Sequence, residues 1–142
     1  MDNENNERPE LKGAPSIGLN FLEYVDEINK KYFNNGTKMA VHSFALAVGM
    51  QLGERLPREQ WGGHQPGSQF STYDGIKGII EIFRINGDLS EEITPVLIAS
   101  EYINGGLNWL KQIGFETGSD ESFRELASAF PHLTEHKEVA GN

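Results

Sequence analysis

The sequence predicts an all-α protein, a compact bundle of about five helices with disordered acidic tails at both ends. Three observations support this class. Apolar residues recur at helical spacing in five segments, no segment shows a strong strand-like alternation, and two of the helical segments are nearly free of charge. Helices that are apolar on most sides are typical of the centre of a bundle.

The length of 142 residues corresponds to one domain. Residues 1–20 and 134–142 contain few large apolar side chains, so they cannot bury enough surface to offset the entropy of ordering and are predicted to be flexible tails. Residues 21–133 are predicted to form the helical domain. Roughly 110 residues are enough for a core without disulfides or metal.

The first helix is predicted over residues 21–33, with Asn20 as its N-cap and the Asn-Asn-Gly segment at 34–36 as its end. The second helix begins at Thr37 and is apolar on most sides, which makes it the central core helix. Gly49 lowers helix propensity, which indicates either close approach by a neighbouring element or fraying.

Residues 55–73 are predicted to form a long irregular loop, with room for one short hairpin within 61–73, where residues 69–73 alternate loosely. A short third helix is expected over 74–84.

The fourth helix begins either at Ser90 or at Thr94 with a proline in its first turn, and it forms a second core helix. The pair Gly105-Gly106 in its middle must either kink it or admit a close neighbour. Ser119 is predicted to cap the fifth helix, over residues 120–130.

Composition and charge exclude several classes. The chain has no cysteine, which excludes disulfides and cysteine-ligated metals. The N-terminus is acidic and has no apolar run, and the longest uncharged stretch, over 39–53, is too short to cross a bilayer. These features predict a cytoplasmic protein. The net charge is −9, with −7 in residues 88–142 and +1 in residues 36–87, so direct binding to duplex DNA is not expected.

We find no pattern of catalytic or metal-binding residues, and we predict no catalytic residue, no metal and no cofactor. The sequence contains none of the known nucleophile or phosphate-loop motifs, and its histidines are not spaced as metal ligands are. His42 lies on an apolar helix and is interpreted as a core histidine, with a proton carrier or ligand as the alternative. His64 is the histidine best placed for an exposed role, whereas His132 and His136 in the tail allow at most adventitious metal binding.

Acidic residues give one ambiguous position. The pairs at 26–27, 91–92 and 120–121 are adjacent in sequence, so they diverge on a helix surface. Glu101 lies in an apolar helix, where it is either a buried acid with a raised pKa or the partner of a Lys or Arg from the middle segment. We favour the pairing, because an unpaired buried charge is costly.

The loop interleaves basic and aromatic residues, a pattern typical of protein-binding loops with aromatic anchors. The alternative is that Trp61 and Phe70 only pin the loop to the core. The residues predicted to bind a partner are Arg55, Arg58, Trp61, His64, Phe70 and Tyr73.

Two stretches, TKMAVHSFALAVGMQLGERLP and IASEYINGGLNWL, resemble segments of small proteins associated with DNA phosphorothioation (Dnd-type) modification and restriction systems. The second stretch carries the distinctive motif, formed by Glu101, Tyr102, Asn104, Gly105, Gly106 and Leu107. The resemblance implies an accessory subunit of a prokaryotic defence system and no catalytic residues. The loop at 61–73 departs from that family's pattern, which leaves the identity of the partner open.

Three functions remain. The first is a non-enzymatic accessory or adaptor subunit that docks onto larger nuclease, ATPase or DNA-modifying subunits through protein–protein binding. The second is an acidic inhibitor or DNA mimic, of the antitoxin or anti-restriction type, suggested by the charge of residues 88–142. The third is an enzyme that uses Glu101 with His64 or His42, which requires these side chains to converge in one pocket. We favour the first.

Overall fold

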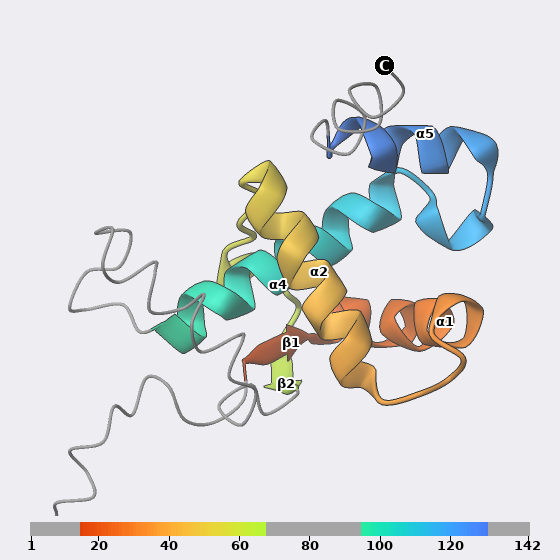
Figure 1. Cartoon of the computed structure of the whole chain (residues 1–142). Helices are drawn as coiled ribbons and strands as arrows, with labels where there is room; N and C mark the ends of the chain where they lie inside the picture. Colours follow the sequence, from red (N-terminus) through yellow and green to blue (C-terminus); the bar gives the residue numbers. More distant parts are fainter. Residues whose placement is uncertain (1–14, 68–94, 131–142) are drawn as a thin grey trace, which may run out of the picture.

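The computed structural model describes residues 15–67 and 95–130 (Figure 1). This part of the chain is mostly helical, as predicted, but it also contains a two-stranded antiparallel sheet that the all-α class does not include. The helix predicted over 74–84 and the start at Ser90 lie outside the described residues. Of the stretch 61–73 that could hold a short hairpin, residues 61–67 are described, and they contain a strand, His64–Pro66, that pairs with Ser16–Gly18. The elements are β1 (Ser16–Gly18), η3 (Leu19–Phe21), α1 (Leu22–Tyr32), α2 (Lys38–Leu52), η4 (Arg58–Gln60), β2 (His64–Pro66), α4 (Pro95–Gln112), η6 (Phe115–Thr117) and α5 (Asp120–Ser128).

The local signals at helix ends mostly act as predicted. Asn34 and Asn35 adopt left-handed backbone, with φ of 59° and 57°, directly after α1. The side chain of Ser119 accepts a hydrogen bond of 3.1 Å from the backbone N–H of Ser122 and so caps α5. Asn20 is not the N-cap of α1, because the 3-10 turn η3 intervenes and moves the cap position to Phe21.

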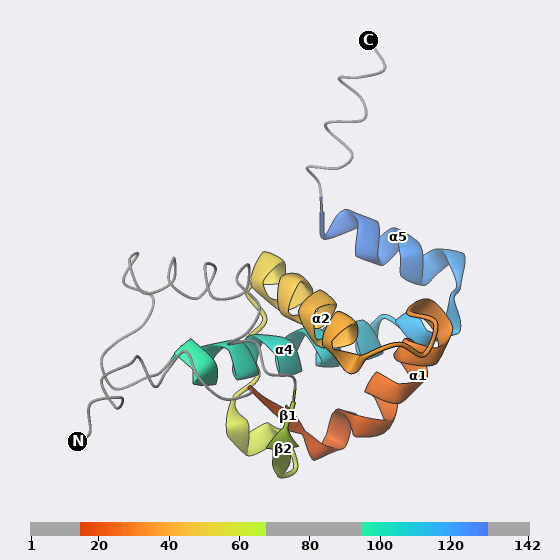
Figure 2. The same ribbon diagram turned by 60° about the horizontal axis from the view of Figure 1, so that its bottom comes forward.

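Helices α2 and α4 cross with their backbones in contact (Figures 1 and 2), and three glycines make this possible. A Cβ built on Gly49 would overlap the carbonyl of Tyr102, and one on Gly106 would overlap the carbonyl of Ala45. Gly105 lies in the same way under the carbonyl of Glu54. The sequence predicted either a kink or a close neighbour at Gly105 and Gly106. The structure shows a close neighbour, the backbone of α2 and of the residues that follow it.

The core surrounds this crossing. Apolar side chains from α1, α2, α4 and β1 are completely or almost completely buried in one cluster. Stacked and edge-on rings join α1, η6 and α5 at its margin, with Tyr32 and Phe115 centroids 4.4 Å apart and Phe115 and Phe123 centroids 6.2 Å apart. The fully buried residues include Ile28, Val41, Val48, Ile103, Leu107 and Leu110.

The two-stranded sheet places part of the predicted tail inside the domain. β1 pairs with β2 in the register Ser16 opposite Pro66, Ile17 opposite Gln65 and Gly18 opposite His64. Only 2% of Ile17 is exposed. Residues 16–18, which composition assigns to the N-terminal tail, form β1, and long-range hydrogen bonds to Ser100 and Asn104 join them to α4.

Replacing Gly106 by alanine tests the crossing. Helix propensity alone predicts that G106A stabilises the protein by about 1 kcal/mol. We expect instead a loss of about 2–3 kcal/mol in the free energy of unfolding, because the added methyl group must push α2 away from α4. Urea denaturation measures the difference.

The matched control is G53A, which adds the same methyl group where no atom lies within 4 Å. Gly53 has a φ of 68°, so its substitution costs only about 1–2 kcal/mol of left-handed backbone strain. A G106A protein as stable as the wild type would contradict direct backbone contact between the two helices.

Candidate functional site

The motif residue Asn104 acts as a structural clamp. Its side chain is completely buried. Its Oδ1 accepts a hydrogen bond of 2.7 Å from the N–H of Gly18, and its Nδ2 donates bonds of 3.0 Å and 2.7 Å to the carbonyls of Ser16 and Ser100. The Ser100 hydroxyl also accepts a 2.8 Å bond from the N–H of Ser16. The side chains of α4 thus occupy the edge of β1 that does not face β2.

Glu101 pairs with a basic residue from the middle segment, as predicted. Its Oε1 accepts bonds of 2.9 Å and 2.6 Å from Nε and Nη2 of Arg55. The carboxylate side chain is 17% exposed and the Arg55 side chain 38% exposed, and the guanidinium also lies 5.6 Å from the centroid of the Tyr102 ring. Arg55 therefore ties the start of the loop to α4, which is a structural role for a residue predicted to bind a partner.

Trp61 is not an exposed anchor. Its side chain is completely buried, and its indole N–H donates a 2.8 Å hydrogen bond to the carbonyl of Leu56. The alternative interpretation, that Trp61 pins the loop to the core, is the one that the structure supports. Phe70 and Tyr73 lie outside the described residues.

Exposed side chains nevertheless gather around Trp61. The Arg58 guanidinium lies 5.9 Å from the Trp61 ring centroid, and the His64 ring meets it edge-on at 6.1 Å. Leu19 is 45% exposed, and its backbone N–H donates a 2.9 Å bond to the carbonyl of Gly63, next to His64. We call the surface formed by Leu19, Arg58 and His64 the Trp61 surface.

Sequence reasoning missed Leu19, because it lies in the predicted tail. The sequence offered one signal, an isolated apolar triplet of Ile17, Leu19 and Phe21 before the first helix. In the structure Ile17 and Phe21 turn inward, whereas Leu19 remains outside.

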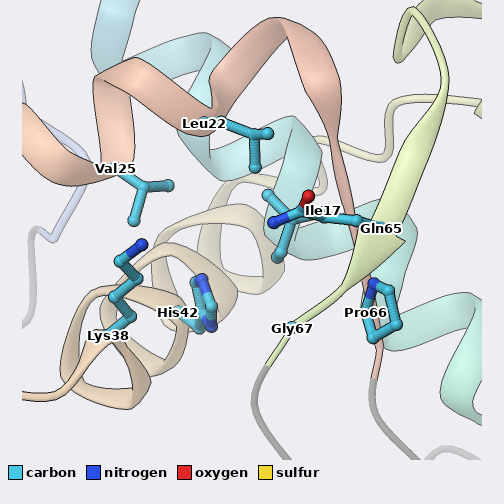
Figure 3. Close-up of a pocket in the computed structure, with 8 residues that line it drawn as sticks. All are labelled: Ile17, Leu22, Val25, Lys38, His42, Gln65, Pro66 and Gly67. Atoms are coloured by element: carbon cyan, nitrogen blue, oxygen red, sulfur yellow. The ribbon is translucent and has the colours of Figure 1, made fainter.

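A pocket of about 240 Å³ lies between α2 and the sheet (Figure 3). Lys38 and His42 line it from α2, one helical turn apart, and Gln65 and Pro66 face them from β2. Its lining consists of Ile17, Leu22, Val25, Lys38, His42, Gln65, Pro66 and Gly67.

His42 is 5% exposed, in agreement with its interpretation as a core histidine. Burial, together with the positive charge of Lys38, lowers the pKa of His42 to about 4. The imidazole is therefore neutral at pH 7. Neither Glu101 nor His64 lines its pocket, so the three groups of the enzyme hypothesis do not converge there.

A wider groove of about 510 Å³ runs along α1 and η6. Its lining mixes both signs of charge, and the adjacent acids Asp26 and Glu27 are both exposed, as predicted for a solvated helix face. Burial and the neighbouring Glu116 raise the pKa of Tyr24 beneath it. Within residues 15–67 and 95–130, no three His, Asp or Glu side chains form a group able to hold a metal ion. His132 and His136, like the acids at 91–92, lie outside these ranges.

Comparisons with protein-family models, with curated proteins and with solved structures gave no match to this chain. The resemblance to Dnd-associated proteins therefore stays a prediction. In the described part of the chain, no helix is both long enough and apolar enough to span a bilayer.

The clamp is tested by replacing Asn104 with alanine. N104A leaves the buried N–H of Gly18 without its acceptor, and the carbonyl of Ser16 without its donor. We expect a loss of about 2–4 kcal/mol in the free energy of unfolding. Amide hydrogen exchange at Gly18 should also accelerate more than exchange in α2. The control is N108A, at a half-buried asparagine one turn later on α4, where equal effects would argue against a specific clamp.

The buried histidine predicts a pH dependence. Because the folded-state pKa of His42 is about 4 and its ordinary value is 6.5, the unfolded chain binds more protons between these values. Stability should therefore fall as the pH drops from about 6.5 to about 4, by up to about 3 kcal/mol from this group. Thermal unfolding of H42Q should show a flatter profile than the wild type, whereas H64Q, at an exposed position, should not. A wild-type slope retained in H42Q would assign the effect to other groups.

Proposed function

We propose that this chain is a non-enzymatic accessory subunit that binds a larger protein through the Trp61 surface. The observation that carries the proposal is the exposed Leu19, which contacts Gly63 next to His64. Arg58 and His64 both lie against the ring of the buried Trp61. Exposed apolar groups next to arginine are typical of the anchors that contribute most to protein–protein binding.

The rigidity of this surface follows from its contacts. Trp61 is fixed by its indole hydrogen bond, and a Cβ on Gly18 would lie only 2.8 Å from the Cβ of Trp61, so strand and loop are tightly packed. The clamp at Asn104 then fixes Gly18 to α4. Because these contacts hold the backbone that carries Leu19 and His64, ordering that backbone costs little conformational entropy on binding.

The composition of the surface favours a protein partner with an acidic or polar rim around an apolar pocket. Arg58 and His64 supply donors, and Leu19 supplies apolar area. The neighbouring strand β2 is exposed along its length but contains Pro66, which has no N–H to offer to an added strand. We therefore expect side chains, rather than strand addition, to make the contact.

The partner class comes from the sequence resemblance alone. It suggests a larger nuclease, ATPase or DNA-modifying subunit of a prokaryotic defence system. The net charge of −9 argues that any effect on duplex DNA is exerted through such a partner.

The alternative, an acidic inhibitor that imitates DNA, has less support. It relies on the acids of residues 88–142 as a phosphate-like array. Glu101 is one of them, and it is paired with Arg55 instead of being displayed.

Affinity purification from the native host tests the proposal. The tagged wild-type chain should retain one larger protein after stringent washing. L19D should reduce the recovered amount at least about tenfold, because it places an unpaired charge in the apolar part of the contact. The partner is identified by mass spectrometry, and binding is then measured with purified components.

The matched control is F123D. Phe123 is the other exposed large apolar residue among the described ones, at 42%, and it lies on α5, away from the sheet (Figure 1). F123D should leave recovery unchanged if it remains folded by circular dichroism. No retained partner, or equal losses in L19D and F123D, would contradict the Trp61 surface as the docking site.

A further inference from the structure

The pocket between α2 and the sheet has a different charge from the rest of the protein. The chain carries −9 overall, yet Lys38 is the one side chain with a full charge among the residues that line this pocket. Ile17, Leu22 and Val25 give the lining an apolar part, next to His42 and the residues of β2. A ligand that suits it must combine one negative charge with a small apolar body.

We propose that this pocket binds the carboxylate of a small branched apolar acid, with the carboxylate on Lys38 and the apolar body against Ile17 and Leu22. This site goes beyond the proposed function, because it does not include the Trp61 surface and does not depend on it. The same chemistry is offered by a free short-chain acid and by the C-terminal leucine of a peptide.

Lys38 can accept such an anion at low cost. Its Nζ lies 3.1 Å from Oδ1 of Asp26, and both side chains are more than half exposed, at 56% and 59%. Exposed ion pairs contribute little to stability, so a carboxylate in the pocket competes with Asp26 on favourable terms.

His42 gives the pocket a second polar group. It follows Lys38 by one helical turn, so both side chains project from the same face of α2 (Figure 3). The imidazole is deeper than Lys38, at 5% exposure. The deep end of the pocket thus contains a polar ring in addition to its apolar side chains.

The volume limits the ligand. The pocket has a volume of about 240 Å³. This is below the range of about 300–1,000 Å³ typical of drug-sized ligand sites. A branched five-carbon acid such as isovalerate, or one leucine side chain with its terminal carboxylate, fits this size.

Titration of the full chain by ¹⁵N NMR tests the proposal, with sodium isovalerate as the probe and isovaleramide as its uncharged counterpart. We expect shifts at the amides of Ile17, His42 and Gly67 and a Kd on the order of 1 mM, as suits so small a ligand. The amide should bind at least about tenfold more weakly, because it lacks the charge that Lys38 recognises.

Two variants with opposite expected effects make the test specific. K38Q should weaken isovalerate binding by about tenfold, whereas D26N should strengthen it severalfold by removing the competing carboxylate. K30Q removes an equal charge from the exposed face of α1, outside the lining, and should leave the Kd unchanged.

A second titration distinguishes the source of the acid. A peptide ending in Gly-Gly-Leu with a free carboxylate is compared with the same peptide amidated. Binding of the free peptide at the same amides supports chain ends as ligands, and binding of isovalerate alone supports a free acid.

The proposal is overturned by any of three results: no shifts around the pocket, equal affinity for acid and amide, or an unchanged Kd in K38Q. None of these bears on the recovery of a partner by the Trp61 surface, so the two proposals fail independently.

Discussion

The backbone contact between α2 and α4 is the constraint on which the rest of the structure depends. Gly49, Gly105 and Gly106 let the two helices approach until carbonyl groups occupy the space where side chains would be. Gly105 lies under the carbonyl of Glu54, so the same contact fixes the residues that leave α2. This contact places Arg55 next to Glu101. The first residues of the loop therefore run along α4.

The second constraint is polar. Ile17 is the one large apolar side chain that residues 15–20 bury, and α4 holds the backbone beside it by hydrogen bonding. Asn104 and Ser100 supply to β1 the donors and acceptors that another strand would supply in a larger sheet. A buried amide side chain stabilises the fold only when all its hydrogen bonds are formed. A buried polar group without a partner costs more free energy than one hydrogen bond contributes.

The alternation of side chains along β1 separates the two candidate surfaces. Ile17 points to one side and lines the pocket beside His42. Gly18 faces the other way, against Trp61. A three-residue strand thus lines the pocket of Lys38 and His42 on one side and packs against Trp61 on the other.

The sequence located α1, α2, α4 and α5 and the cap at Ser119, and it limited Gly105-Gly106 to either a kink or a close neighbour. These follow from periodicity and from the backbone preferences of single residues, which are local properties. It also indicated that Glu101 needs a basic partner, because the cost of burying a charge does not depend on the fold.

The role of Asn104 in holding β1 becomes visible in the fold and not in the sequence. Its hydrogen-bond partners, Gly18 and Ser16, lie 86 and 88 residues away along the chain. For the same reason, only the folded structure shows that Trp61 is buried and Leu19 exposed. It also shows that Lys38 and His42 line one pocket with Gln65. Each of these depends on contacts between distant segments, and no local pattern records which segments will meet.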